Sequence, residues 1–171
     1  MAEDATRAPD VADPASRAAA IGAKRRWREH IAGGAGDPAA LRIGLAASFT
    51  ADTLVPFIGA ALLGEVIVPA FTVGPYNQLF QTCLDPEASF HGPSDVIVLL
   101  WRLEDLLAEE IAGFLGGDAA ALTRARGKLD ALVGAVAQLR AGFKGMVVVG
   151  VPPYPTGPAA NLLALDNAGG L

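Results

Sequence analysis

The chain has 171 residues and a formal net charge of -5, with 52% hydrophobic and 18% charged residues. This length suits one ordinary domain, and the hydrophobic content excludes a wholly disordered chain. The single cysteine excludes an intramolecular disulfide and a cysteine-rich zinc site. The negative charge argues against a nucleic-acid partner, because nucleic acids bind basic surfaces.

The predicted elements begin with a helix and then alternate between strands and helices. We expect a flexible tail over residues 1–13, which are rich in alanine, aspartate and proline. The alanine-rich segment 14–32 predicts a helix that ends at the glycine-rich residues 33–38. The next expected elements are a strand over 41–48, a helix over 50–64 capped by Thr50 or Asp52, a strand over 66–73 with Pro69 marking an edge, and a short helix over 74–84.

The second half of the chain continues this alternation as far as residue 152. We expect a loop over 85–94, a strand over 95–101, a helix over 104–115, a long helix over 118–143 and a strand over 146–152. Residues 153–171 predict an irregular tail, because they are first rich in proline and then only briefly apolar.

Apolar strands that alternate with helices indicate a parallel sheet covered on both faces. We therefore predict an α/β fold: a three-layer α/β/α sandwich of the flavodoxin-like type with about four parallel strands, preceded by an N-terminal helix. The sandwich spans residues 41–152. No helix follows the expected fourth strand, so we expect an incomplete domain whose uncovered sheet edge favours association into oligomers.

An apolar run over residues 54–71 approaches the length of a membrane-spanning helix, which needs about 20 residues. Glu65, two prolines and two glycines interrupt the run, and no basic residue flanks it. Two buried elements of a folded domain explain the run better, so we expect no membrane partner.

The polar, acidic first residues do not resemble a secretory signal, which makes the cytoplasm the expected location.

Polar residues follow three of the four predicted strands, at the edge where ligands of an open parallel sheet bind. Ser48 follows the first strand and is a candidate nucleophile, since backbone N–H groups at a strand-to-helix junction can stabilise an oxyanion. Gly74 and Asn77 follow the second strand as candidate oxyanion or ligand contacts. Arg102, a candidate ligand contact, and Asp105, a weak candidate for assisting Ser48, follow the third strand.

A structural interpretation competes with this chemistry. Ser48 and Thr50 also suit the role of helix caps, although Thr50 is a further candidate ligand contact. An activated serine needs a base. Of the two histidines, His30 lies in the N-terminal helix, and His91 precedes the third strand, at the end of the sheet opposite Ser48. The sequence therefore supplies no obvious imidazole base for Ser48.

The N-terminal helix carries a basic cluster that indicates either a solvated face or a docking site for an acidic partner: Lys24, Arg25, Arg26 and Arg28.

The sequence gives no sign of a reactive thiol, a metal site or a cofactor site. Cys83 has no basic neighbour and is expected to be a buried structural thiol. No paired histidines or cysteines have metal-ligand spacing, and no phosphate-binding or dinucleotide-binding glycine pattern occurs, so we expect no metal ion and no cofactor.

The chain resembles the N-terminal domain of the FkbH-like proteins over residues 41–166. The short motifs that carry the resemblance keep a characteristic order and spacing: SFT at 48–50, LVPF at 54–57, VGPY at 73–76, LDP at 84–86, Asp95 opening an apolar strand that leads to EDL at 104–106, and VVVGVPPYP at 147–155.

The resemblance implies an SGNH-hydrolase-like fold that precedes a phosphatase-type domain of the haloacid dehalogenase superfamily. Such proteins load a glyceryl unit from 1,3-bisphosphoglycerate onto an acyl carrier protein in polyketide pathways, with the chemistry attributed to the second domain. The resemblance covers the first of these two domains only. Against the SGNH pattern, Ser48 matches the nucleophile and Gly74 the oxyanion glycine, whereas Arg102 and Glu104 stand where an asparagine is needed.

Three functions follow in order of preference. The first is a non-catalytic recognition domain that binds an acyl carrier protein or a partner enzyme, with the basic cluster as its docking surface. The second is an esterase or acyltransferase with Ser48 as nucleophile, Gly74 and Asn77 as oxyanion donors and Asp105 assisting. The third is a truncated remnant without a function of its own.

Overall fold

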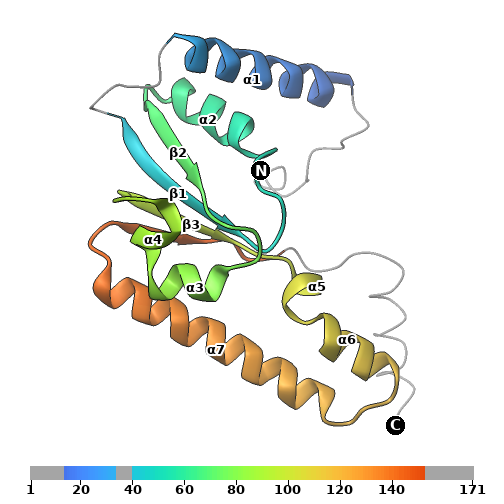
Figure 1. Ribbon diagram of the computed structural model, residues 1–171. Coiled ribbons are helices and arrows are strands. Elements are labelled where there is room, and N and C mark those ends of the chain that lie inside the picture. The colour runs from blue at the N-terminus through green and yellow to red at the C-terminus, as the bar shows by residue number, and fades with distance from the viewer. Residues whose placement is uncertain (1–13, 34–39, 153–171) are drawn as a thin grey trace, which may run out of the picture.

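The computed structural model describes residues 14–33 and 40–152. It is an α/β fold with a four-stranded parallel sheet and helices on both sides, preceded by an N-terminal helix (Figure 1). The predicted fold class, a three-layer sandwich, is thereby confirmed. The expected tails, residues 1–13 and 153–171, lie outside the described residues.

The sheet consists of β1 (Leu41–Ala47), β2 (Pro69–Val73), β3 (Val96–Leu100) and β4 (Met146–Val149), in the order β2-β1-β3-β4. All three pairings are parallel, so the carboxyl ends of the strands meet at one edge. Residues 43–47 of β1 are buried, because β1 is central and both its faces are covered. Pro69 opens the edge strand β2, where a missing backbone N–H is tolerated.

One face of the sheet is covered by α2 (Val55–Gly64), and α1 (Pro14–Ala32) stacks on α2 (Figure 1). Trp27 of α1 is buried and lies against Gly59: a Cβ atom added at Gly59 would overlap its ring. The Trp27 ring also packs against Phe71 of β2 in a T-shaped arrangement, with the ring centroids 5.6 Å apart. The bulk of Trp27 and the missing side chain at Gly59 therefore fix α1 on the body of the domain.

The opposite face is covered by α3 (Leu79–Leu84), α4 (Pro86–Phe90) and the long α7 (Ala121–Gly142) (Figure 1). Phe90 of α4 packs directly on β1 at Gly44, where its ring occupies the space that a side chain would need. The main hydrophobic core lies between these helices and the sheet and consists of Ala46, Leu79, Cys83, Phe90, Ile97, Leu99 and Leu139.

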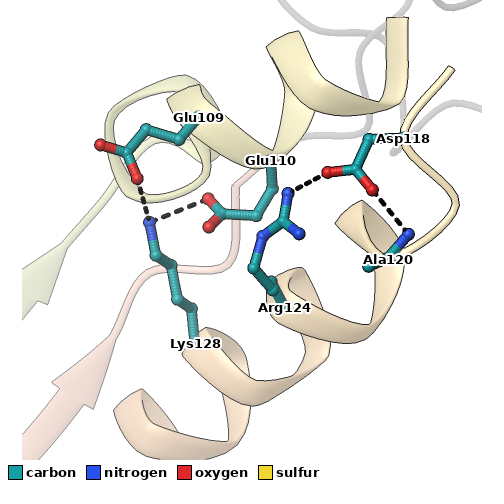
Figure 2. A network of polar contacts seen from close by, with 6 residues as sticks. All are labelled: Glu109, Glu110, Asp118, Ala120, Arg124 and Lys128. Atoms are coloured by element: carbon teal, nitrogen blue, oxygen red, sulfur yellow. Dashed lines mark hydrogen bonds and ion pairs between the residues drawn. The ribbon is translucent and has the colours of Figure 1, made fainter. Parts of the chain in front are cut away.

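Two shorter helices, α5 (Leu103–Leu106) and α6 (Ala108–Leu115), connect β3 to α7. Figure 2 shows how α6 and the residues after it are tied to α7 by ion pairs. Lys128 donates to Glu110 at 2.9 Å, and Arg124 pairs with Asp118 at 2.6 Å. Glu110 is buried, and its partner Lys128 avoids the large cost of an unpaired buried charge.

Several predicted boundaries were wrong, and local hydrogen bonding explains the differences. The helix predicted from residue 50 begins at Val55, and neither Thr50 nor Asp52 caps it, because residues 51–54 form a turn in which the Leu54 N–H donates to Ala51. The expected loop over 85–94 contains α4, whose first turn is capped when Asp85 accepts from the Ala88 N–H.

Other elements were shorter or divided. The helix predicted over 74–84 is confined to α3, and the one predicted over 104–115 is split between α5 and α6. The apolar run over 54–71 contributes to α2 and to the start of β2, as expected for two elements of a folded domain. Among the described residues no helix has both the length and the apolar character needed to cross a bilayer.

Candidate functional site

Ser48 lies directly after β1 at the carboxyl edge of the sheet, and the residue is 2% exposed. The Ser48 hydroxyl donates to Asp105 Oδ2 at 2.8 Å and accepts from the Arg102 backbone N–H at 3.0 Å. The predicted convergence of the first and third strand ends is therefore present. A buried hydroxyl that donates and accepts in this way ties the segment after β3 to the end of β1.

The carboxylate partner of Ser48 is itself held by Arg102. Arg102 Nε and Nη2 donate to the two oxygens of Asp105 at 2.8 and 2.9 Å, a bidentate pair. The Arg102 contact is the main cause that lowers the pKa of Asp105, and Asp105 in turn raises the pKa of Arg102. Asp105 is thus a weakly basic, ionised carboxylate at neutral pH, which makes it a poor acceptor for the Ser48 proton.

The backbone donors expected to serve an oxyanion have partners inside the fold. The Ser48 N–H donates to the Leu100 carbonyl at 3.0 Å, and the Gly74 N–H donates to the Leu45 carbonyl at 2.9 Å. Gly74 lies against the Phe90 ring, which is 3.1 Å from the position of an added Cβ atom. Close packing of Phe90 therefore accounts for the glycine without any ligand.

The other residues predicted at this edge are exposed. Asn77 has a left-handed backbone conformation, with φ of 54°, and its N–H donates to the Ala47 carbonyl at 3.1 Å. Thr50 lies in the segment between β1 and α2 and faces solvent. Arg102 lies over the Phe49 ring, 5.2 Å from its centroid, so an aromatic face and a carboxylate both engage its guanidinium.

Neither histidine lies at this edge. His91 ends α4 in a left-handed conformation and precedes β3, at the amino end of the sheet. His30 lies on α1 with its ring centroid 5.4 Å from that of Trp27. Within the described ranges, no group of three or more histidine, cysteine, aspartate or glutamate side chains could hold a metal ion.

The basic cluster on α1 is exposed, but its four members do not share one face. Successive helix residues are rotated by about 100°, so Arg26 projects roughly 160° away from Arg28. Arg26 runs along Gly22, whose added Cβ atom would lie 3.6 Å from Arg26 Nη1. Lys24 and Arg25 project on the same side as Arg28, with Lys24 Nζ 5.5 Å from the centroid of the Phe57 ring.

Two isoleucines on the same side of α1 were missed as candidate site residues. Ile21 is 71% exposed and Ile31 is 46% exposed. Ile21 precedes Lys24 by three residues and Ile31 follows Arg28 by three, and this spacing is the signal that places them on one helix face. We call this surface the α1 basic face; it consists of Ile21, Lys24, Arg25, Arg28 and Ile31.

A cleft opens at the amino end of the sheet, away from Ser48, between the α3–α4 segment and the end of α7. Cys83 lines it and is buried, and burial raises the pKa of its thiol. The thiol is therefore protonated at neutral pH and is a poor nucleophile. This agrees with the expectation of a structural cysteine.

Comparison of the chain with protein-family models, curated proteins and solved structures gave no match.

Proposed function

We propose that the chain is a non-catalytic recognition domain of an FkbH-like glyceryl-loading system that acts in the cytoplasm. Its partner in this proposal is an acidic acyl carrier protein, which docks on the α1 basic face. The observation that carries the proposal is an exposed basic helix face with two exposed isoleucines on a chain that is acidic as a whole.

The charge distribution supports an acidic partner. The α1 helix holds five of the 13 basic residues of the chain and one of its 18 acidic residues. Charge complementarity of this kind steers association and fixes the orientation of the partner. Arg25 has a long contact of 3.7 Å with Glu29, and both side chains are largely exposed, so this pair neutralises the face only weakly.

The two isoleucines add apolar contact area to the charged face. Ile21 and Ile31 are ten residues apart, which is about 15 Å along a helix, the length of a short docking surface. Exposed aliphatic side chains inside a polar rim are typical of protein interfaces. Because Trp27 fixes α1 on α2, the face is presented on a rigid support and binding needs no ordering of the helix.

The geometry at Ser48 favours recognition over hydrolysis. The Ser48 hydroxyl is buried and both its hydrogen-bonding functions are used, its carboxylate partner is weakly basic, and the Ser48 and Gly74 N–H groups donate to backbone carbonyls. A serine nucleophile needs an accessible hydroxyl, a base and free oxyanion donors. The hydrolase alternative stays a prediction, for which Ser48→Ala provides the test given below.

Calorimetric titration with an acidic polyketide acyl carrier protein tests the proposal. Arg28→Glu should weaken binding about tenfold, which corresponds to ~1.4 kcal/mol, because it places a negative charge against an acidic partner. Arg26→Glu changes the net charge by the same amount on the other side of α1 and is the matched control. It should change the dissociation constant by less than about twofold, because its contribution is long-range and screened.

Equal weakening by both variants would show that only net charge matters and would contradict docking on the α1 basic face. Absence of binding by the unaltered chain would contradict the proposed function itself.

A further inference from the structure

The outer edge of β4 has no strand partner in the described part of the chain. β4 is the last strand in the order β2-β1-β3-β4 and pairs with β3 alone. An edge strand presents a row of backbone donors and acceptors, which a further strand can pair with.

The direction of these backbone groups follows from the pairing with β3. The Met146 N–H donates to the Asp95 carbonyl at 3.0 Å, and the Gly150 N–H donates to the Leu99 carbonyl at 2.8 Å. Backbone groups alternate in direction along a strand, so the N–H and C=O groups of Val147 and Val149 point away from β3. The free edge thus begins at Val147 and continues through Val149.

The side chains along this edge are apolar and exposed. Met146 is 63% exposed, Val148 41%, Val149 39% and Val151 86%. No charged residue occurs over residues 145–152. The opposite edge strand differs, because Pro69 at the start of β2 removes a backbone donor. Within β4 itself, Met146–Val149, no charge and no proline is present to block edge pairing.

We propose that β4 pairs with β4 of a second copy of this chain, antiparallel across a two-fold axis, so that two four-stranded sheets join into one. Val149 then lies opposite the partner subunit's Val149, and each donates its outward N–H to the carbonyl of the other. A second copy fits this edge because neither strand brings a charge, so no like charges oppose each other.

The sequence after β4 argues against pairing by the residues that follow directly. Pro152, Pro153 and Pro155 carry no backbone N–H and cannot donate to a ladder. A second copy of β4 offers both donors and acceptors at every outward position and needs no turn to reach the edge.

Light scattering during size-exclusion chromatography of the full chain, at concentrations from the micromolar to the millimolar range, tests this inference. We expect the mass to approach twice the 17.5 kDa of one chain as concentration rises. Val149→Pro removes an outward N–H without breaking a hydrogen bond to β3, so it should leave a monomer at every concentration. Val149→Thr keeps the N–H and the β-branched shape, and should still dimerise.

Val149→Lys is a second test that does not depend on the folding of the proline variant. It keeps the backbone donor and places two like charges opposite each other across the two-fold axis. It should also remain a monomer, with the circular dichroism of the unaltered chain. Two results would overturn the inference: an unaltered chain that stays monomeric at all concentrations, or a Val149→Lys variant that dimerises as well as the unaltered chain. Dimerisation only after deletion of residues 153–171 would show that this segment occupies the edge instead.

Discussion

At the residue scale, Ser48 shows how one hydroxyl can fit two opposite interpretations. A serine at the end of a buried strand, 2.8 Å from a carboxylate, has the pairing expected of a nucleophile. The same hydroxyl accepts from the Arg102 N–H, and Arg102 holds both oxygens of that carboxylate. Burial and the low basicity of Asp105 favour a structural tie that sets the path of the chain after β3.

Ser48→Ala should destabilise the fold by about 1–2 kcal/mol, because it leaves the Arg102 N–H without its acceptor in a partly buried site. Chemical denaturation measures this change, with Thr50→Ala as the exposed control that should be nearly neutral. Treatment with a fluorophosphonate and intact-mass analysis should give no adduct on either protein. A covalent adduct on the unaltered chain that is lost in Ser48→Ala would reverse this assignment and favour the esterase or acyltransferase.

At the element scale, α1 is held by a contact that depends on one missing side chain. Gly59 of α2 leaves room for the Trp27 ring, and Phe71 of β2 makes a T-shaped contact with the same ring. The pairing joins α1 to both α2 and the sheet. The position of the α1 basic face, and hence the proposed docking, rests on this packing.

Gly59→Ala should release or shift α1, because the new methyl group would overlap the Trp27 ring, and we expect a loss of about 1–3 kcal/mol in stability. Gly64→Ala lies in the same helix, where an added Cβ atom meets nothing within 4 Å, and should be neutral or slightly stabilising. Acrylamide quenching of Trp27 fluorescence, in a Trp101→Phe background, should rise in Gly59→Ala alone. Equal quenching in both variants would show that Gly59 does not seat the helix.

The elements differ in how far the sequence could predict them. β1 and β3 are apolar runs bounded by turn residues, so their existence and parallel pairing follow from pattern and alternation. The five-residue α4 depends on one capping bond from Asp85, which no periodicity reveals. The Ser48 and Gly74 N–H groups donate to backbone carbonyls, and these hydrogen bonds depend on the strand register. The register is set by tertiary packing, so the sequence pattern does not predict them.

At the scale of the whole molecule, ion pairs make the stability depend on pH. The pKa values of four carboxylates are lowered, in each case chiefly by a hydrogen bond that a basic side chain donates. Arg42 donates to Asp95, Arg102 to Asp105, Lys128 to Glu110 and Arg124 to Asp118. A carboxylate with a lowered pKa favours the folded state above its ordinary pKa, and this contribution is lost as the pH falls towards the lowered value.

The pKa of Asp95 falls from 3.8 to about 2 in the folded chain. The urea midpoint should therefore decrease as the pH is lowered from about 4 to about 2. Asp95→Asn should be less stable than the unaltered chain at neutral pH, because Arg42 joins β1 to the start of β3 through this carboxylate. It should also lose less stability over that pH interval. Parallel pH profiles for the two proteins would exclude Asp95 as a source of the dependence.

The whole molecule carries two separate contact surfaces in this account, the α1 basic face and the open edge of β4. One is basic and suits an acidic partner, and the other is uncharged and suits its own copy. They lie on different elements, so charge reversal on α1 should leave self-association unchanged.

The most direct test of the central claim is a chemical-shift map of the isotopically labelled chain during titration with an acidic acyl carrier protein. The account predicts that the largest shifts fall on α1 around Ile21, Arg25, Arg28 and Ile31, with Ser48 and Gly74 unaffected. Shifts concentrated around Ser48, Gly74 and Asn77 would instead place the partner at the carboxyl edge of the sheet and contradict docking on α1.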